Sequence, residues 1–192
     1  PSVTRYGRHN GGVGSVNLML MAEELLGDHL DSPPTLRGEY LHRVDGETSE
    51  EHLERITGWF SESIESGIPI LFYMRRYGRT SDGRQPRMVI GHHVVVTSLE
   101  EEASKTDSGA LRIGFTFVDS SSGRVDHGEL MVAAREFTAP TFTYRFDGDR
   151  ARTTEKLHTG RPLLEVLVPS YESGRSRKTE IMVEQFATFA DN

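Results

Sequence analysis

Reactive side chains stand at three places along the chain, in the order of a nucleophile, a base and an orienting acid. Ser15 follows a run of glycines at the expected start of a helix, where free N–H groups and aligned dipoles favour an anion. His92 and His93 begin the apolar run GHHVVV, and Asp119 ends the next apolar run. A histidine can take a proton from a nucleophile, and a carboxylate behind it fixes its tautomer. This order favours acyl transfer at an amide.

Each of these residues also has an ordinary structural interpretation. A serine at a helix start commonly caps free backbone donors, and an aspartate before Ser-Ser-Ser-Gly commonly opens a turn and bonds its own backbone. Two adjacent histidines on a strand point to opposite faces, so only one of them can reach a given cleft. His92 shares its face with alternate valines of the strand, and alternation alone leaves either His92 or His93 as the base. The catalytic hypothesis therefore depends on the three places occurring together.

Two helices are predicted in the first third of the chain. The segment from Ser15 to Leu26 is apolar over its first two turns and ends at Gly27, which predicts a buried helix. Thr48 and Glu51 have the spacing of a capping box. The segment that follows carries apolar residues at steps of three and four and ends at Gly67, which predicts an amphipathic helix. Its apolar face consists of Leu53, Ile56, Phe60 and Ile64.

The period changes to two after this helix, and strands are predicted at 68–74, 88–99, 111–119, 141–146 and 163–168. Polar, glycine-containing segments at 75–87, 100–110, 147–161 and 171–179 predict loops. The segment 180–190 fits a short helix or an edge strand equally well. Helices followed by strands predict an α+β fold with an antiparallel sheet. We expect one domain over 1–192, with a helical part at about 10–67 and a sheet part at about 68–192.

Composition excludes several functional classes. The formal net charge is −7 and the basic residues form no stripe, so we expect no nucleic-acid partner. No run approaches the roughly twenty apolar residues of a membrane helix, so we expect a soluble protein, cytoplasmic or delivered to another cell, with no membrane partner. We expect no metal site, because no two histidines stand four apart on a helix and an adjacent pair cannot both face one ion from a regular strand. We also expect no cofactor. The histidines are His9, His29, His42, His52, His92, His93, His127 and His158.

Four segments of the chain resemble the papain-like cysteine peptidase superfamily, most nearly the peptidases that trim double-glycine leaders from bacteriocins. These are NGGVGSVNLML, IPILFY, GHHVVVTSL and FTFVDSSSGRV, within residues 5 to 125. The resemblance implies a papain-like fold, with N-terminal helices packed on an antiparallel sheet. It also implies that His92 is the base, that Asp119 orients it, and that the amide of Asn10 helps to bind the oxyanion.

The chain departs from this family at the nucleophile, because it contains no cysteine. Ser15 carries a nucleophilic oxygen where the helix should begin and is the preferred replacement. A gap-free alignment to the leader peptidases instead puts Gly11 at the cysteine position, and one to papain puts Val16 there. The serine is either natural or an inactivating substitution for cysteine, and the sequence does not separate these cases.

Two functions follow from the resemblance. The first is a hydrolase of peptide bonds or glutamine amides, a peptidase or deamidase, in which Ser15, His92 and Asp119 act together on a peptide or protein substrate. The second is a pseudo-peptidase that binds a peptide or protein partner in the same cleft without cutting it. The missing thiol favours the second function, whereas a histidine paired with an acid favours the first.

Overall fold

The computed structural model describes residues 24, 36–68, 70–78, 87–132, 137–138, 141–147, 150–157, 161–172 and 180–190. The elements over these ranges are β1 (Leu36–Tyr40), α3 (Ser49–Glu65), β2 (Ile70–Gly78), β3 (Arg87–Leu99), β4 (Ser104–Lys105), β5 (Leu111–Asp119), β6 (Val125–Met131), β7 (Phe137–Thr138), β8 (Thr141–Asp147), β9 (Arg150–Leu157), β10 (Pro162–Leu163), β11 (Glu165–Leu167), α4 (Pro169–Glu172) and β12 (Glu180–Ala190). No helix within these ranges is long and apolar enough to cross a membrane.

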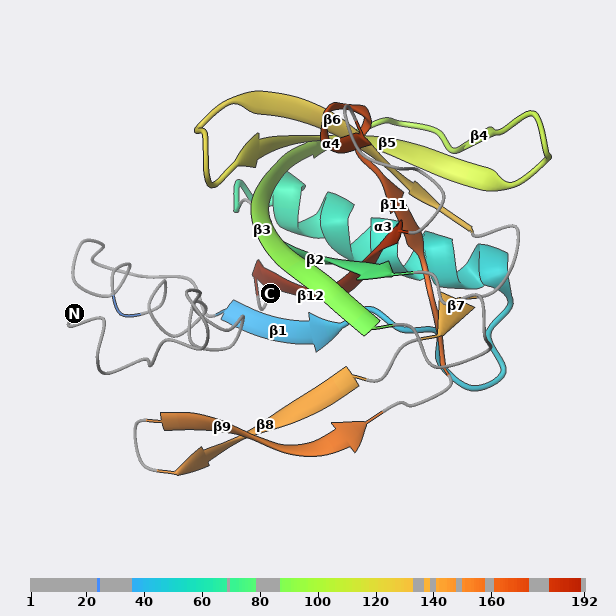
Figure 1. The fold of residues 1–192 in the computed structure, drawn as a ribbon. Helices are drawn as coiled ribbons and strands as arrows, with labels where there is room; N and C mark the ends of the chain where they lie inside the picture. The colour runs from blue at the N-terminus through green and yellow to red at the C-terminus, as the bar shows by residue number, and fades with distance from the viewer. Residues whose placement is uncertain are drawn as a thin grey trace.

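An eight-stranded antiparallel sheet curves into a nearly closed barrel (Figure 1). The strands lie in the order β1-β12-β11-β6-β5-β3-β2, with β4 paired to β5. In addition, β12 pairs with β2, from Glu180 opposite Gly78 to Thr188 opposite Leu71, which brings the two ends of the sheet together. The prediction of an α+β fold with an antiparallel sheet is therefore confirmed.

Helix α3 begins at the predicted capping box. The Thr48 side chain accepts a hydrogen bond from the Glu51 amide, and the Glu51 carboxylate accepts one from the Thr48 amide at 2.7 Å. Leu53, Ile56 and Phe60 are buried on one face of the helix, as predicted. Burying each side chain of this size contributes roughly 1.5–3 kcal/mol. The cap and the apolar face together account for a stable helix here.

The core lies between α3 and the inner face of the curved sheet. Figure 1 shows α3 crossing the space between β5 and β6 on one side and β2 and β12 on the other. Phe60 of α3 meets Phe72 of β2 edge to face at 5.6 Å, and Phe72 meets Phe115 of β5 in the same way at 5.8 Å. Alternate residues along β2, β3 and β5 are buried in this core, so alternation defines the inner face of each strand.

Several segments differ from the sequence prediction. Strand β2 continues to Gly78, because Arg75–Gly78 pairs with the start of β3 and with β12, although 75–87 was predicted to be a loop. Strand β9 occupies most of the predicted loop 147–161 and pairs with β8. Strand β12 pairs with β1, β2 and β11 and is therefore no edge strand.

Further strands lie where none was predicted, among them the two-residue strands β4, inside the predicted loop 100–110, and β7. Strand β1 lies inside the stretch expected to be helical, and β6 was not predicted at all. Each carries charged residues within a short run, which weakens the alternation from which strands are recognised. The helix expected at Ser15 to Leu26 lies outside the described residues except for Glu24, which is helical.

Candidate active site

His92 lies on the inner face of β3, at the end of the core. It is two residues before Val94, whose side chain is fully buried, and it faces the same side of the sheet. Its own side chain is 25% exposed, because the core ends at this position. The imidazole is therefore held by the sheet and still reachable from solvent.

Asp119 ends β5 directly beside this position. The β3–β5 ladder pairs Val94 with Asp119, which makes His92 and Asp119 diagonal neighbours on one face. Side chains in this relation can touch, and Nε2 of His92 lies 2.8 Å from Oδ2 of Asp119. The Asp119 side chain is only 10% exposed, so the carboxylate is more shielded from solvent than the imidazole. The structure thus brings together two of the residues singled out from the sequence.

The two carboxylate oxygens of Asp119 have different partners. Oδ1 accepts hydrogen bonds from the amides of Ser121 and Ser122 at 2.8 and 2.9 Å and from the Ser122 hydroxyl at 3.2 Å. These bonds build the turn between β5 and β6, in which Gly123 adopts a positive φ of 67°. Oδ2 remains for His92. The turn-opening interpretation of Asp119 and the orienting interpretation are therefore compatible, because each uses a different oxygen.

Tyr171 of α4 is a third member of the site that the sequence did not indicate. Its hydroxyl donates to Oδ2 of Asp119, the same oxygen that His92 contacts. Its ring meets the His92 ring edge to face at 5.5 Å. Tyr171 follows Asp119 by 52 positions and belongs to no motif, so only the folded chain relates the two residues.

The charge of Asp119 is strongly stabilised. Burial by itself would raise the pKa of this carboxyl, but hydrogen bonds from Tyr171, from His92 and from the amides of Ser122 and Ser121 outweigh it and hold the pKa well below the usual range. Burial and the neighbouring Asp119 carboxylate together raise the pKa of Tyr171, which keeps the phenol protonated. At neutral pH the site therefore contains a carboxylate that can only accept hydrogen bonds.

This charge state assigns the tautomer of His92. An ionised carboxylate has no proton to give, so Nε2 must carry the hydrogen in its bond to Asp119. In the neutral imidazole the lone pair then belongs to Nδ1, and Nδ1 is the atom that can take up a proton. The pair has the arrangement of a base and its orienting acid.

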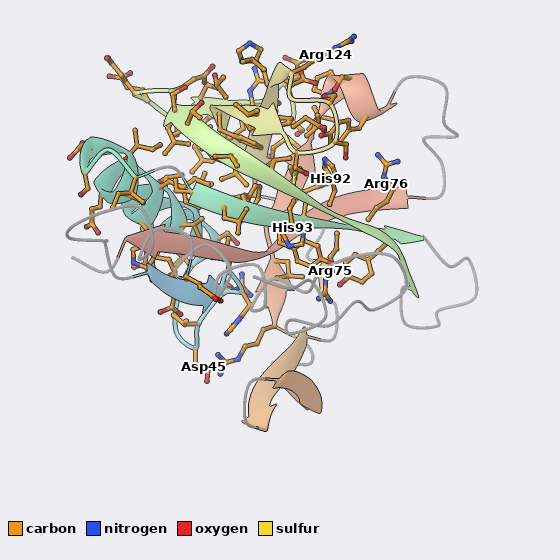
Figure 2. All side chains as sticks on the ribbon, turned by 90° about the vertical axis from the view of Figure 1, so that its left-hand side faces the viewer. Asp45, Arg75, Arg76, His92, His93 and Arg124 are labelled. Carbon is orange, nitrogen blue, oxygen red and sulfur yellow. The ribbon has the colours of Figure 1, made fainter. Side chains whose placement is uncertain are left out.

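His93 lies on the opposite face of β3, as Figure 2 shows. Its ring stacks on Tyr73 of β2 with centroids 4.3 Å apart, and the Arg75 guanidinium also lies against Tyr73, 4.9 Å from the centre of its ring. Burial, with the nearby charges of His92 and Arg75, lowers the pKa of His93 to about 4. Of the two histidines, His92 is the one that contacts Asp119.

The remaining predicted site residues lie outside the described residues. These are Ser15 and Asn10, together with the alternative nucleophile positions Gly11 and Val16. Among the residues that are described, no group of three or more histidine, aspartate or glutamate side chains is arranged to hold a metal ion.

A surface cavity of about 230 Å³ lies elsewhere on the sheet and does not include His92, Asp119 or Tyr171 in its lining. It is lined by Ser98, Leu99, Glu100, Gly114, Phe115, Thr116, His127, Gly128, Glu129 and Pro169. The hydrogen-bonded group around Asp119 has the better geometry for chemistry, because its imidazole is both oriented and accessible.

Comparison with known proteins gave no match. The chain matches no protein-family model, and no curated protein or solved structure is significantly similar to it. A functional proposal must therefore rest on the geometry of the site and on the motifs in the sequence.

Proposed function

We propose that this protein is a papain-like hydrolase scaffold that acts on peptide bonds or glutamine amides. The observation that carries the proposal is the contact between a partly exposed imidazole and a buried, ionised carboxylate, His92 and Asp119 at 2.8 Å. This pairing is what a nucleophilic hydrolase requires of its base, since the carboxylate fixes the tautomer and stabilises the imidazolium that forms. The resemblance of residues 5 to 125 to leader peptidases supports the same assignment.

In the proposed reaction, Oγ of Ser15 attacks the carbonyl carbon while its proton passes to Nδ1 of His92. Backbone amides at the start of the helix predicted from Ser15 to Leu26, with the Asn10 side chain, would bind the oxyanion. The proton then moves from Nδ1 to the leaving nitrogen, which departs as an amine from a peptide or as ammonia from a glutamine side chain. Water, deprotonated by His92, releases the acyl group. Asp119 stays ionised throughout.

The absence of cysteine makes a direct test possible, because any introduced cysteine is the only thiol in the protein. We would make Ser15→Cys and measure its alkylation rate by a thiol-reactive probe, together with cleavage of peptides and release of ammonia from glutamine. A thiol next to an accepting imidazole ionises below its ordinary range, so labelling at mildly acidic pH should be fast. The variants Gly11→Cys and Val16→Cys test the two alternative alignments.

His93→Gln provides a matched control for His92→Gln, since the two histidines are adjacent on one strand but face opposite sides. In the Ser15→Cys background, His92→Gln should abolish the fast labelling and His93→Gln should leave it in place. Equal labelling with and without His92, at all three cysteine positions, would refute the hydrolase proposal.

The absence of cysteine also favours a second candidate, a pseudo-peptidase that binds a peptide beside His92. In this case none of the cysteine variants reacts in a His92-dependent way, and a peptide binds to the unaltered protein with micromolar affinity. His92→Gln would then change the affinity for the peptide, and neither the unaltered protein nor the variant would cleave it.

A further inference from the structure

Helix α4 holds Tyr171 against the site through hydrogen bonds to two strands of the sheet and a turn of its own. The Tyr171 amide donates to the carbonyl of Val168 at 3.0 Å, and Ser170 donates to the carboxylate of Asp126 on β6. The Tyr171 carbonyl accepts a hydrogen bond from Arg76 of β2 at 3.4 Å. These contacts attach the short helix to two strands of the sheet, so the Tyr171 hydroxyl is held in a fixed position beside Asp119.

The Tyr171 ring also fits closely between its neighbours. It meets His92 edge to face at 5.5 Å and an interplanar angle of 81°, and it meets Phe117 at 6.2 Å and 62°. Edge-to-face contacts restrict how either ring can turn. The phenol therefore limits the motion of the imidazole both directly and through the oxygen that the two residues share.

Oδ2 of Asp119 is the shared atom, because it accepts from His92 and from Tyr171 at once. A second donor withdraws negative charge from the oxygen that the imidazole contacts. It also keeps the carboxylate from rotating about its own bond. Removing that donor should leave more charge facing His92 and allow the carboxylate to move.

We propose that Tyr171 is a positioning residue for His92, which fixes the orientation of the imidazole through Asp119 and moderates its affinity for a proton. The residue need not touch a substrate to act in this way. Its importance for turnover rests on the proposed function, but its effect on His92 does not. The inference also ties the C-terminal third of the chain, which carries no recognised motif, to the site.

Charged and titratable groups surround His92 and Tyr171. Asp119 of β5 and Tyr171 of α4 contact the imidazole, and His93 is the next residue on β3. Arg76 of β2 donates to the Tyr171 carbonyl, and Asp126 of β6 accepts from Ser170 and raises the pKa of Tyr171. Tyr171→Phe changes one hydroxyl among these groups and alters no formal charge at neutral pH. A change in the titration of His92 would therefore report the lost hydrogen bond.

The test is an NMR titration of the His92 ring in the full chain, comparing the wild type with Tyr171→Phe. We expect the variant to titrate at a higher pH by about half a unit to one unit, since the imidazolium gains attraction from Oδ2. Tyr73→Phe is the matched control, because it removes the same hydroxyl from a tyrosine stacked on His93. It should leave the titration of His92 unchanged.

An unchanged His92 titration in Tyr171→Phe, or an equal shift in Tyr73→Phe, would overturn the inference. If Tyr171→Phe does not fold, Ser170→Ala takes its place, because it loosens α4 from Asp126 while keeping the phenol. That variant should shift the titration upward by a smaller amount, and no shift would again overturn the inference.

A second readout separates this inference from the proposed function. In the Ser15→Cys background, the pH dependence of labelling should move in the same direction as the NMR titration. If labelling does not depend on His92 but the NMR shift is present, the hydrolase proposal fails and the role of Tyr171 stands. If labelling depends on His92 but no NMR shift is seen, the role of Tyr171 fails and the hydrolase proposal stands.

Discussion

Replacing Asp119 by asparagine keeps the shape of the side chain and removes the negative charge that His92 and Tyr171 both contact. Oδ1 can still accept from the amides of Ser121 and Ser122, so the turn between β5 and β6 should survive. The loss falls on Oδ2, where an amide NH₂ would face the donors of His92 and Tyr171. The substitution therefore tests the charge and leaves the packing in place.

The expected magnitude follows from the hydrogen bonds that lose their acceptor. A bond to a charged group contributes about 1.5–3 kcal/mol, and two such bonds end at Oδ2. His92 is a quarter exposed and can turn toward water, which offsets part of the loss. We expect Asp119→Asn to lower the free energy of unfolding by about 3 kcal/mol at neutral pH.

The same carboxylate predicts how this difference depends on pH. Because the folded-state pKa is depressed, the stabilisation is fully present above the unfolded value of 3.8 and is lost as the pH falls through the folded value. The unfolded chain begins to take up a proton before the folded one does. Between about pH 5 and about pH 3 the gap between wild type and Asp119→Asn should narrow by about 1 kcal/mol.

Urea denaturation followed by circular dichroism at both pH values measures the two quantities. Asp107→Asn serves as the control, because Asp107 is an exposed aspartate in a turn and its replacement should cost little. A loss of unfolding free energy in Asp119→Asn no larger than that in Asp107→Asn would refute the reasoning. A difference in unfolding free energy between wild type and Asp119→Asn that stays constant across the pH range would also refute it.

Three further predictions concern the surrounding fold. Thr48→Ala removes half of the capping box of α3 and should lower the free energy of unfolding by about 1 kcal/mol in urea denaturation, with the m-value unchanged. Phe60→Ala empties a fully buried position at the centre of the aromatic contacts and should lower it by about 3–5 kcal/mol in the same assay. The lowered pKa of His93, about 4, means that the unfolded chain binds a proton first as the pH falls below 6.5, so the wild type should lose up to about 2 kcal/mol between about pH 7 and about pH 5. The share of the loss that comes from His93 should be absent in His93→Gln when thermal unfolding is followed over the same range.

The sequence predicted those parts of the fold whose signals are local. Helix α3 was predicted with its cap because Thr48 and Glu51 interact within one turn. Strand β5 was predicted at Leu111–Asp119 because apolar residues recur at every second position from Leu111 to Phe117, and in the structure partly exposed and buried residues alternate from Arg112 to Asp119. The end of β2 was missed because Arg75 and Arg76 suggest a surface loop, whereas both are buried by pairing with neighbouring strands.

The candidate site was predictable only in part, for a similar reason. The order of His92 and Asp119 along the chain suggested a pair, and the register of β3 against β5 brings their side chains into contact. Register depends on the whole sheet and cannot be read from either strand alone. Tyr171 was missed because only the folded sheet brings it next to Asp119, and two residues 52 positions apart leave no local pattern in the sequence.

The pairing of β12 with β2 and β1 has a consequence for how the chain reaches its native state. These partners come from opposite parts of the sequence, so the two edges can join only after a large loop has lost its conformational freedom. Topologies rich in such distant pairings are slow to fold. Before β12 pairs with β2, the backbone donors and acceptors along one side of β2 have no partner strand. An unpaired edge of this kind can pair with strands of other chains. Refolding at high protein concentration should therefore lose material to aggregation before the last strand is in place.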